Sequence, residues 1–117
     1  MRVLFVLNDP PYGTERSYNG LRLASNVLKK SESPAVTVFL LGDAVSVAKG
    51  NQQTPNGYYN LERMLKGLLS RGGKVLLCGT CMDARGLREE DLVEGCRRSS
   101  LDELTDATLG ADKVLVF

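Results

Sequence analysis

Two cysteines separated by two residues give this sequence its clearest candidate chemistry. Cys78 and Cys81 form the segment C-G-T-C, directly after the apolar residues 75–77. Four interpretations fit such a pair: a redox couple, half of a metal site, two buried apolar side chains, or one reactive thiol beside an inert one. The chain has no histidine and only three cysteines. Cys–His catalysis, mixed Cys/His zinc sites and a Cys₄ site within one chain are therefore excluded, and we expect neither a metal nor a cofactor.

Cys78 is the better candidate for a reactive thiol, although a buried apolar role remains the alternative. It follows an apolar run, so free N–H groups of the next residues and the nearby cation Arg85 would favour its thiolate. Cys81 is either a resolving thiol or a turn residue without a partner. Cys96 is interpreted as structural. A local ion pair is expected between Asp83 and Arg85.

Short apolar runs predict the strands that position these residues. They cover residues 3–7, 36–42, 74–78 and 113–117. Their apolarity is continuous, which is typical of strands covered on both faces of a parallel sheet. A fifth, weaker strand is expected near residues 95–99.

Helical patterns alternate with these runs. Apolar periodicity predicts helices over residues 16–30 and 59–70. A third helix is expected between Ser100 as N-cap and Gly110 as its end. A short helix capped by Asp43 is also expected.

The alternation of strands and helices predicts a single domain over residues 1–117 with a three-layer α/β/α sandwich and a mainly parallel five-stranded sheet. In a flavodoxin-like strand order, the first and third strands are neighbours. The loop after the first strand would then lie beside Cys78, where ligands bind in such sheets. Candidate pocket residues in this loop are Asn8, Tyr12, Gly13, Thr14 and Arg16. The alternative for Gly13 and Thr14 is a simple turn and a helix cap.

The composition argues against two classes of binding partner, nucleic acids and membranes. The net charge is +1 and aromatic residues make up 6% of the chain, so neither a nucleic-acid surface nor a membrane surface is indicated. No apolar segment is long enough for a signal peptide or a membrane span. We therefore expect a cytoplasmic protein with reduced thiols.

Four segments together resemble the DsrE/DsrF-like family, especially its YchN-like members. They are NDPPYGTERSYNGLRLA, LLGDAV, CGTCMDARGL and SSLDELTDATLGADKVLVF, and they cover nearly the whole chain in order. The resemblance implies a flavodoxin-like fold and a homo-oligomer, either a trimer or a hexamer. Relatives in the DsrEFH and TusBCD complexes pass sulfane sulfur along as a cysteine persulfide. The family's sulfur-carrying position matches Cys78, with Arg85 and Gly86 following at the expected distance.

Three hypotheses for function follow. The first, implied by the resemblance, is a sulfurtransferase-like carrier that accepts sulfane sulfur on Cys78 from a donor protein and passes it to an acceptor protein. The second is a non-catalytic oligomeric binding module. The third is a dithiol redox switch formed by Cys78 and Cys81.

Overall fold

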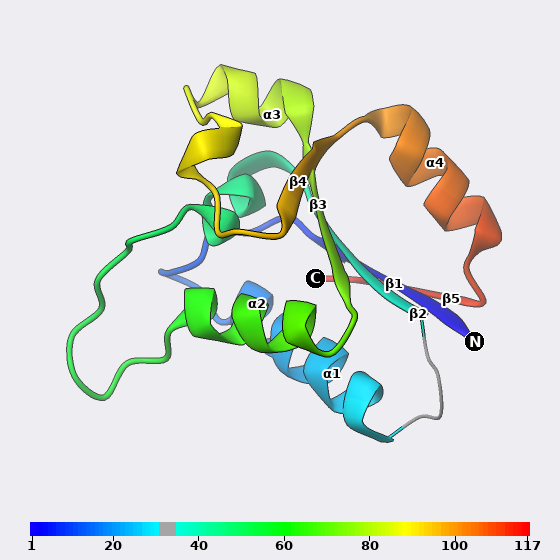
Figure 1. Ribbon diagram of the computed structural model, residues 1–117, viewed down its shortest axis with the longest axis horizontal. Coiled ribbons are helices and arrows are strands. Elements are labelled where there is room, and N and C mark those ends of the chain that lie inside the picture. The colour runs from blue at the N-terminus through cyan, green and yellow to red at the C-terminus, as the bar shows by residue number, and fades with distance from the viewer. Residues whose placement is uncertain (31–34) are drawn as a thin grey trace.

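The fold is built on one parallel sheet (Figure 1). In the computed structural model, which describes residues 1–30 and 35–117, five strands lie in the order β4-β3-β2-β1-β5, and every neighbouring pair is parallel. The strands are β1 (Arg2–Leu7), β2 (Ala35–Leu40), β3 (Lys74–Cys78), β4 (Cys96–Ser99) and β5 (Lys113–Val116). The predicted α/β sandwich with a parallel five-stranded sheet is confirmed.

The three central strands form the core, as their continuous apolar runs predicted. Side chains on both of their faces are buried, because helices cover the sheet on each side. The fully buried side chains of these strands are Phe5, Leu7, Val38, Phe39, Leu40 and Leu77. The edge strands β4 and β5 are mostly exposed or half-buried.

Strand order is where the sequence-based expectation was wrong. β2 lies between β1 and β3, so the first and third strands are not neighbours. The chain steps across the sheet from β1 to β4 and then returns past β1 to place β5 at the other edge. Strand order therefore reverses at β1 and β5, and Cys78 lies two strands away from β1.

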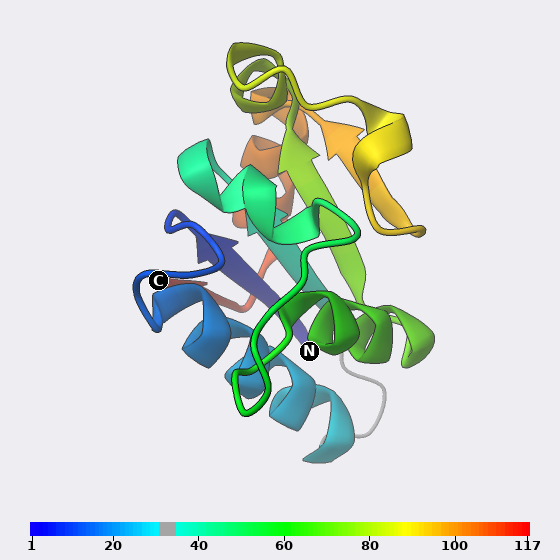
Figure 2. The same ribbon diagram turned by 90° about the vertical axis from the view of Figure 1, so that its left-hand side faces the viewer.

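Right-handed crossovers set the helical layers. The helices α1 (Arg16–Lys30) and α2 (Leu61–Ser70) cover one face, and α4 (Leu101–Gly110) covers the opposite face (Figure 2). α1 packs so closely on the sheet that a Cβ at Gly20 would lie 2.5 Å from a methyl carbon of Leu7. Among the described helices, none combines the length and apolarity that a membrane span needs.

Three short helical segments complete the fold: η1 (Gly42–Ala48), α3 (Gly79–Ala84) and η2 (Glu89–Asp91). α3 begins directly after β3, and η1 packs against both α2 and α3. η1 follows β2 and α3 follows β3 at the carboxyl edge of the sheet, whereas η2 connects α3 to β4. η1 and α3 both contact β3, which ends at Cys78.

The helix caps were predicted with mixed success. The Ser100 hydroxyl accepts the N–H of Glu103 at 3.2 Å, which confirms Ser100 as the N-cap of α4. The expected cap at Asp43 is wrong. No side chain caps η1, and Asp43 lies inside it, with its carboxylate bound to Arg85 instead.

Candidate functional site

The candidate site is centred on Cys78, the last residue of β3. Its neighbours across the sheet are β2 on one side and β4 on the other, with Cys78 paired to Ser99 in the register. The side chain is 9% exposed, which leaves only an edge of the residue in contact with solvent. The apolar run of β3 ends at Cys78, and α3 begins at the next residue. The thiol therefore lies at the carboxyl edge of the sheet.

The sulfur of Cys78 sits among hydrogen-bond donors. The backbone N–H of Cys81 donates to it at 3.3 Å, and the hydroxyl of Thr80 lies 3.3 Å away. Burial opposes ionisation of this thiol. The hydrogen bonds from Cys81 and Thr80 outweigh burial and lower the pKa of Cys78 below the ordinary value for a thiol. Among the three cysteines, Cys78 is the one whose pKa is lowered.

Cys81 has the opposite tendency. Burial raises its pKa, and the hydrogen bond to Cys78 and the charge on Cys78 raise it further. The N–H of Gly42 and the charge of Arg85 act in the other direction but do not prevail. The pair is therefore asymmetric: the thiol of Cys78 ionises more readily than that of Cys81.

Two arginines clamp α3 in place. Arg85 donates through Nε and Nη2 to Asp43 at 3.0 and 2.8 Å, and through Nη1 to the carbonyl of Cys81 at 3.0 Å. Arg98, on β4, makes a bidentate pair with Asp83 at 2.7 and 3.0 Å. The expected pair between Asp83 and Arg85 is wrong, because each has a partner from a segment distant in sequence.

Arg98 is the most informative residue that the sequence did not reveal. Its guanidinium lies against Gly79, where a Cβ would be 2.9 Å from three of its atoms. Its charge interacts with that of Cys78. Only the pairing of β3 with β4 brings it here, and the expected strand at residues 95–99 was the signal from which that neighbourhood could have been found.

Arg85 also differs from its expected role. It was expected to favour the thiolate of Cys78. In the structure it contacts the backbone of Cys81, and its charge opposes, without reversing, the rise in the pKa of that residue's thiol. The cation whose charge interacts with Cys78 is Arg98.

The loop after β1 contains the other predicted site residues. The side chains of Asn8 and Tyr12 contact Phe117 and the start of α2 rather than the cysteines. The Asn8 side chain donates to the carbonyl of Phe117 at 3.2 Å, at the edge where strand order reverses. The Tyr12 hydroxyl accepts the N–H of Leu61 at 3.4 Å, at the start of α2. The backbone of this loop lies close to η1, because the carbonyl of Asn8 is 3.9 Å from where a Cβ of Gly42 would be.

Three further residues of the loop form its turn. The Thr14 hydroxyl donates to Asp9 at 3.1 Å and accepts the N–H of Arg16 at 3.4 Å, and Arg16 forms an ion pair with Asp9 at 3.6 Å. Gly13 has a φ of 100°, which favours glycine. These contacts match the simple turn that was the alternative for this loop. The structure thus brings together Cys78, Cys81 and the Arg85 clamp, and it places Tyr12, Thr14 and Arg16 in separate contacts.

Cys96 provides an internal comparison for Cys78. It lies on β4 beside Val75, and burial raises its pKa to about 12. No opposing hydrogen bond acts on it, so it stays a neutral thiol. This agrees with the structural role expected for it.

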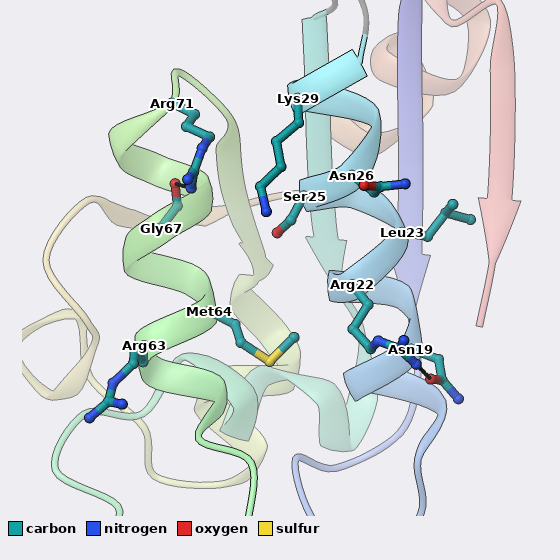
Figure 3. A pocket seen from close by; sticks show the side chains of 10 residues that line it. All are labelled: Asn19, Arg22, Leu23, Ser25, Asn26, Lys29, Arg63, Met64, Gly67 and Arg71. Carbon is teal, nitrogen blue, oxygen red and sulfur yellow. Dashed lines mark hydrogen bonds between the residues drawn. The ribbon is translucent and has the colours of Figure 1, made fainter.

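A separate cavity of about 690 Å³ lies between α1 and α2 (Figure 3). Four cations line it: Arg22, Lys29, Arg63 and Arg71. Lys29 and Met64 point into the space between the helices, whereas Arg63 points away from it. Among the described residues, no carboxylate pairs with any of the four cations. We call this cavity the basic groove.

The sequence of this protein is similar to that of known proteins over its whole length. The model of the DsrE/DsrF-like family matches residues 1–117. The chain belongs to the DsrE/DsrF-like family. Protein YchN of Escherichia coli is 38% identical over 116 residues, which cover 99% of this chain and 98% of YchN. Protein MJ0989 of Methanocaldococcus jannaschii is 38% identical over 117 residues and the full length of both chains.

Solved structures agree with the fold of this DsrE/DsrF-like chain. The crystal structure of E. coli YchN superimposes with a TM-score of 0.93 over 99% of this chain and 98% of that one. The protein of unknown function MTH1491 from Methanobacterium thermoautotrophicum gives a TM-score of 0.79 at 19% identity and 97% coverage of both chains, which shows a shared fold alone. The resemblance inferred from the four sequence segments is confirmed.

Proposed function

We propose that this protein carries sulfane sulfur as a persulfide on Cys78. The observation that carries the proposal is the contrast among the thiols: the pKa of Cys78 is lowered, and those of Cys81 and Cys96 are raised. A thiolate is the form that attacks a sulfane sulfur. Membership of a family with sulfur-relay members is consistent with this role.

The carrier mechanism has two exchanges. The Cys78 thiolate attacks the outer sulfur of a donor persulfide, forms a new S–S bond and releases the donor thiolate. A thiolate on the acceptor then attacks the outer sulfur on Cys78 and returns Cys78 as a thiolate. Each exchange conserves electrons and requires neither a metal nor an added oxidant. Thr80 and Cys81 stabilise the anionic Cys78 sulfur in the state before loading.

Loading with an inorganic polysulfide tests this proposal. Intact-mass measurement on protein quenched directly after loading, followed by peptide mapping, should find one added sulfur on Cys78, and the Cys78→Ser variant should gain none. Cys96→Ser is the matched control and should load as the parent does, because Cys96 is a neutral thiol away from the site. Sulfur found on Cys96, or on Cys81 alone, would contradict the assignment.

We also propose that the chain forms a homo-oligomer through α4 and β5. Val114 and Val116 are 41% and 66% exposed, and Leu101 and Leu109 on α4 are 70% and 81% exposed. The two valines alternate along β5 with Phe117, whose ring faces Gly20 on α1. They therefore face the side of the sheet that carries α4 and remain uncovered there. Such an apolar surface is typical of a protein interface.

The oligomer is tested by sedimentation. The parent chain should sediment as a trimer or a hexamer, and Val116→Asp should shift it toward the monomer. Lys113→Asp, on the same strand but already polar, is the control and should leave the assembly intact. A monomeric parent chain would refute this interface.

A binding module is the second candidate function, and the basic groove is the observation that favours it. Its cations other than Arg63, which points away from the space, have no carboxylate partners among the described residues and suit a polyanionic ligand. Arg22 and Lys29 are seven residues apart on α1, so they are spread over about 10 Å along the helix. This spread fits an extended anion better than a single phosphate. Saturable, salt-sensitive binding of a linear polyphosphate would support this candidate, and its absence would remove it.

A further inference from the structure

We propose that Cys81 resolves the persulfide on Cys78, so that the protein releases sulfide as well as carrying sulfane sulfur. The inference rests on the proposed persulfide at Cys78 and concerns what happens after loading. In this step the Cys81 sulfur attacks the inner sulfur of the persulfide. The products are hydrosulfide and a disulfide between Cys78 and Cys81.

The geometry of the pair supports this step. Cys78 is the N-cap of α3, and the Cys81 N–H donates to its sulfur at 3.3 Å, so the first turn of α3 holds the two cysteines side by side. A thiol in the same helical turn as the inner sulfur needs only a small movement to attack it. A thiol on another molecule must instead approach a side chain that is 9% exposed. The intramolecular attack therefore has the advantage of proximity.

The surroundings of Cys81 suit a nucleophile that becomes active after loading. Its pKa is raised by burial, by the hydrogen bond to Cys78 and by the charge on Cys78. In the persulfide, the charge moves from the inner sulfur to the outer one, so the last two influences weaken. The N–H of Gly42 and the charge of Arg85, which favour the Cys81 thiolate, remain in place.

The fixed position of α3 keeps this arrangement intact. Arg85 ties the carbonyl of Cys81 to Asp43 on η1. Arg98 ties Asp83 to β4. Clamped from both sides, α3 keeps Cys81 in the same helical turn as Cys78.

The atoms and electrons of the step balance. One Cys78 persulfide and one Cys81 thiol give one intramolecular disulfide and one hydrogen sulfide. The new S–S bond replaces the old one, the outer sulfur is reduced to sulfide, and the Cys81 sulfur is oxidised from thiol to disulfide, while the Cys78 sulfur exchanges one S–S bond for another. The proton on Cys81 leaves with the sulfide or passes to water. A dithiol reductant must then reduce the disulfide before the next cycle.

A single-turnover experiment tests the proposal. The reduced protein is loaded with inorganic polysulfide, freed of excess donor, and followed for released sulfide and for protein mass. The parent should release one sulfide per chain and end two hydrogens lighter than its reduced form, with Cys78 and Cys81 linked in the peptide map. Cys81→Ser should keep its sulfur on Cys78 and release sulfide at least about tenfold more slowly, because it lacks the intramolecular nucleophile. Cys96→Ser is the matched control and should release sulfide as the parent does.

The outcomes separate this inference from the carrier proposal. A stable persulfide on Cys78 in both the parent and Cys81→Ser, with no sulfide released, would overturn the inference and leave the carrier proposal standing. No sulfur on Cys78 in either protein would overturn both. Sulfide release at equal rates from the parent and Cys81→Ser would also overturn the inference, because the attack would then not come from Cys81.

Discussion

The cysteine site at the end of β3 and the basic groove between α1 and α2 both contain arginines, but their charges are used differently. At the cysteine site, Arg85 and Arg98 each bind a carboxylate and hold α3 in place. In the basic groove, Arg22 and Arg71 form hydrogen bonds only to uncharged oxygens among the described residues. Arginines paired with carboxylates fix the position of α3, whereas arginines without carboxylate partners are available to bind a ligand.

The same comparison separates two kinds of function. The cysteine site is small and mostly buried, and its distinctive group is a thiol with a lowered pKa. The basic groove is a broad cavity of about 690 Å³ without a nucleophilic thiol among its lining residues. Chemistry is therefore assigned to the first region and binding to the second. The predictions below test this division.

The largest effect is expected from reversing charge in the basic groove. Replacing Arg22 and Arg71 together with glutamate should weaken binding of a linear polyphosphate by more than about tenfold, because each cation that contacts a polyanion releases counterions on binding. Fluorescence anisotropy with a labelled polyphosphate, repeated across a series of salt concentrations, measures the affinity. The control is Lys49→Glu with Lys113→Glu, which makes the same change in net charge outside the groove. Equal losses in both double variants would mean that net charge, and not the groove, controls binding.

A smaller effect is expected from Arg98 at the cysteine site. Removing its charge in Arg98→Ala should raise the pKa of Cys78 and slow its alkylation at neutral pH by about two- to fivefold, because the two charges interact without a direct contact and the effect is small. Residue-resolved mass spectrometry after a short iodoacetamide pulse measures the rate.

Arg97→Ala is the matched control for this change. Arg97 is the neighbouring residue on β4, but it pairs with Glu103. Alkylation of Cys78 should be unaffected in this variant. If the two alanine variants slowed alkylation of Cys78 equally, the claim that the charge of Arg98 specifically favours the Cys78 thiolate would be wrong.

Much of this fold could be predicted from sequence, because the signals were local. The apolar run of residues 74–78 is β3, and Ser100 caps α4 as predicted. Strand order could not be obtained in this way, since apolar runs do not specify which strands pair. The expectation that the first and third strands are neighbours, from which the loop containing Tyr12 and Thr14 was placed beside Cys78, failed for that reason.

The candidate site was predicted only in part, because sequence reveals contacts between nearby residues but not contacts between distant segments. Cys78 and Cys81 are close in sequence, so their proximity could be inferred. The clamps could not, because Arg85 and Asp43 are 42 residues apart and Arg98 and Asp83 are 15 apart. Local charge pairing instead suggested Asp83 with Arg85, which the tertiary contacts replace.

The smallest effect is expected from pH and concerns another paired arginine. Arg97, together with Ser99, lowers the pKa of Glu103 to about 2, below its ordinary value of 4.5. A carboxyl group with a lowered pKa stabilises the fold fully above its unfolded pKa, and this contribution is lost as pH falls toward about 2. The free energy of unfolding of Glu103→Gln should therefore lie below that of the parent by less than about 1 kcal/mol at neutral pH.

Urea unfolding from pH 7 down to pH 2 measures this difference. The gap between the parent and Glu103→Gln should narrow below pH 4.5 and close near pH 2. A gap that stays constant over this range would show that the Arg97–Glu103 pair does not depend on the charge of Glu103.

The most direct test of the central claim is the pH dependence of alkylation at each of the three cysteines in the native protein. Cys78 should react with a midpoint below that of an ordinary thiol, Cys81 with a midpoint above it, and Cys96 should stay unreactive until near its pKa of about 12. A midpoint for Cys78 at or above that of an ordinary thiol would contradict its assignment as the sulfur-carrying thiolate. Reactivity no greater than that of Cys96 would contradict it equally.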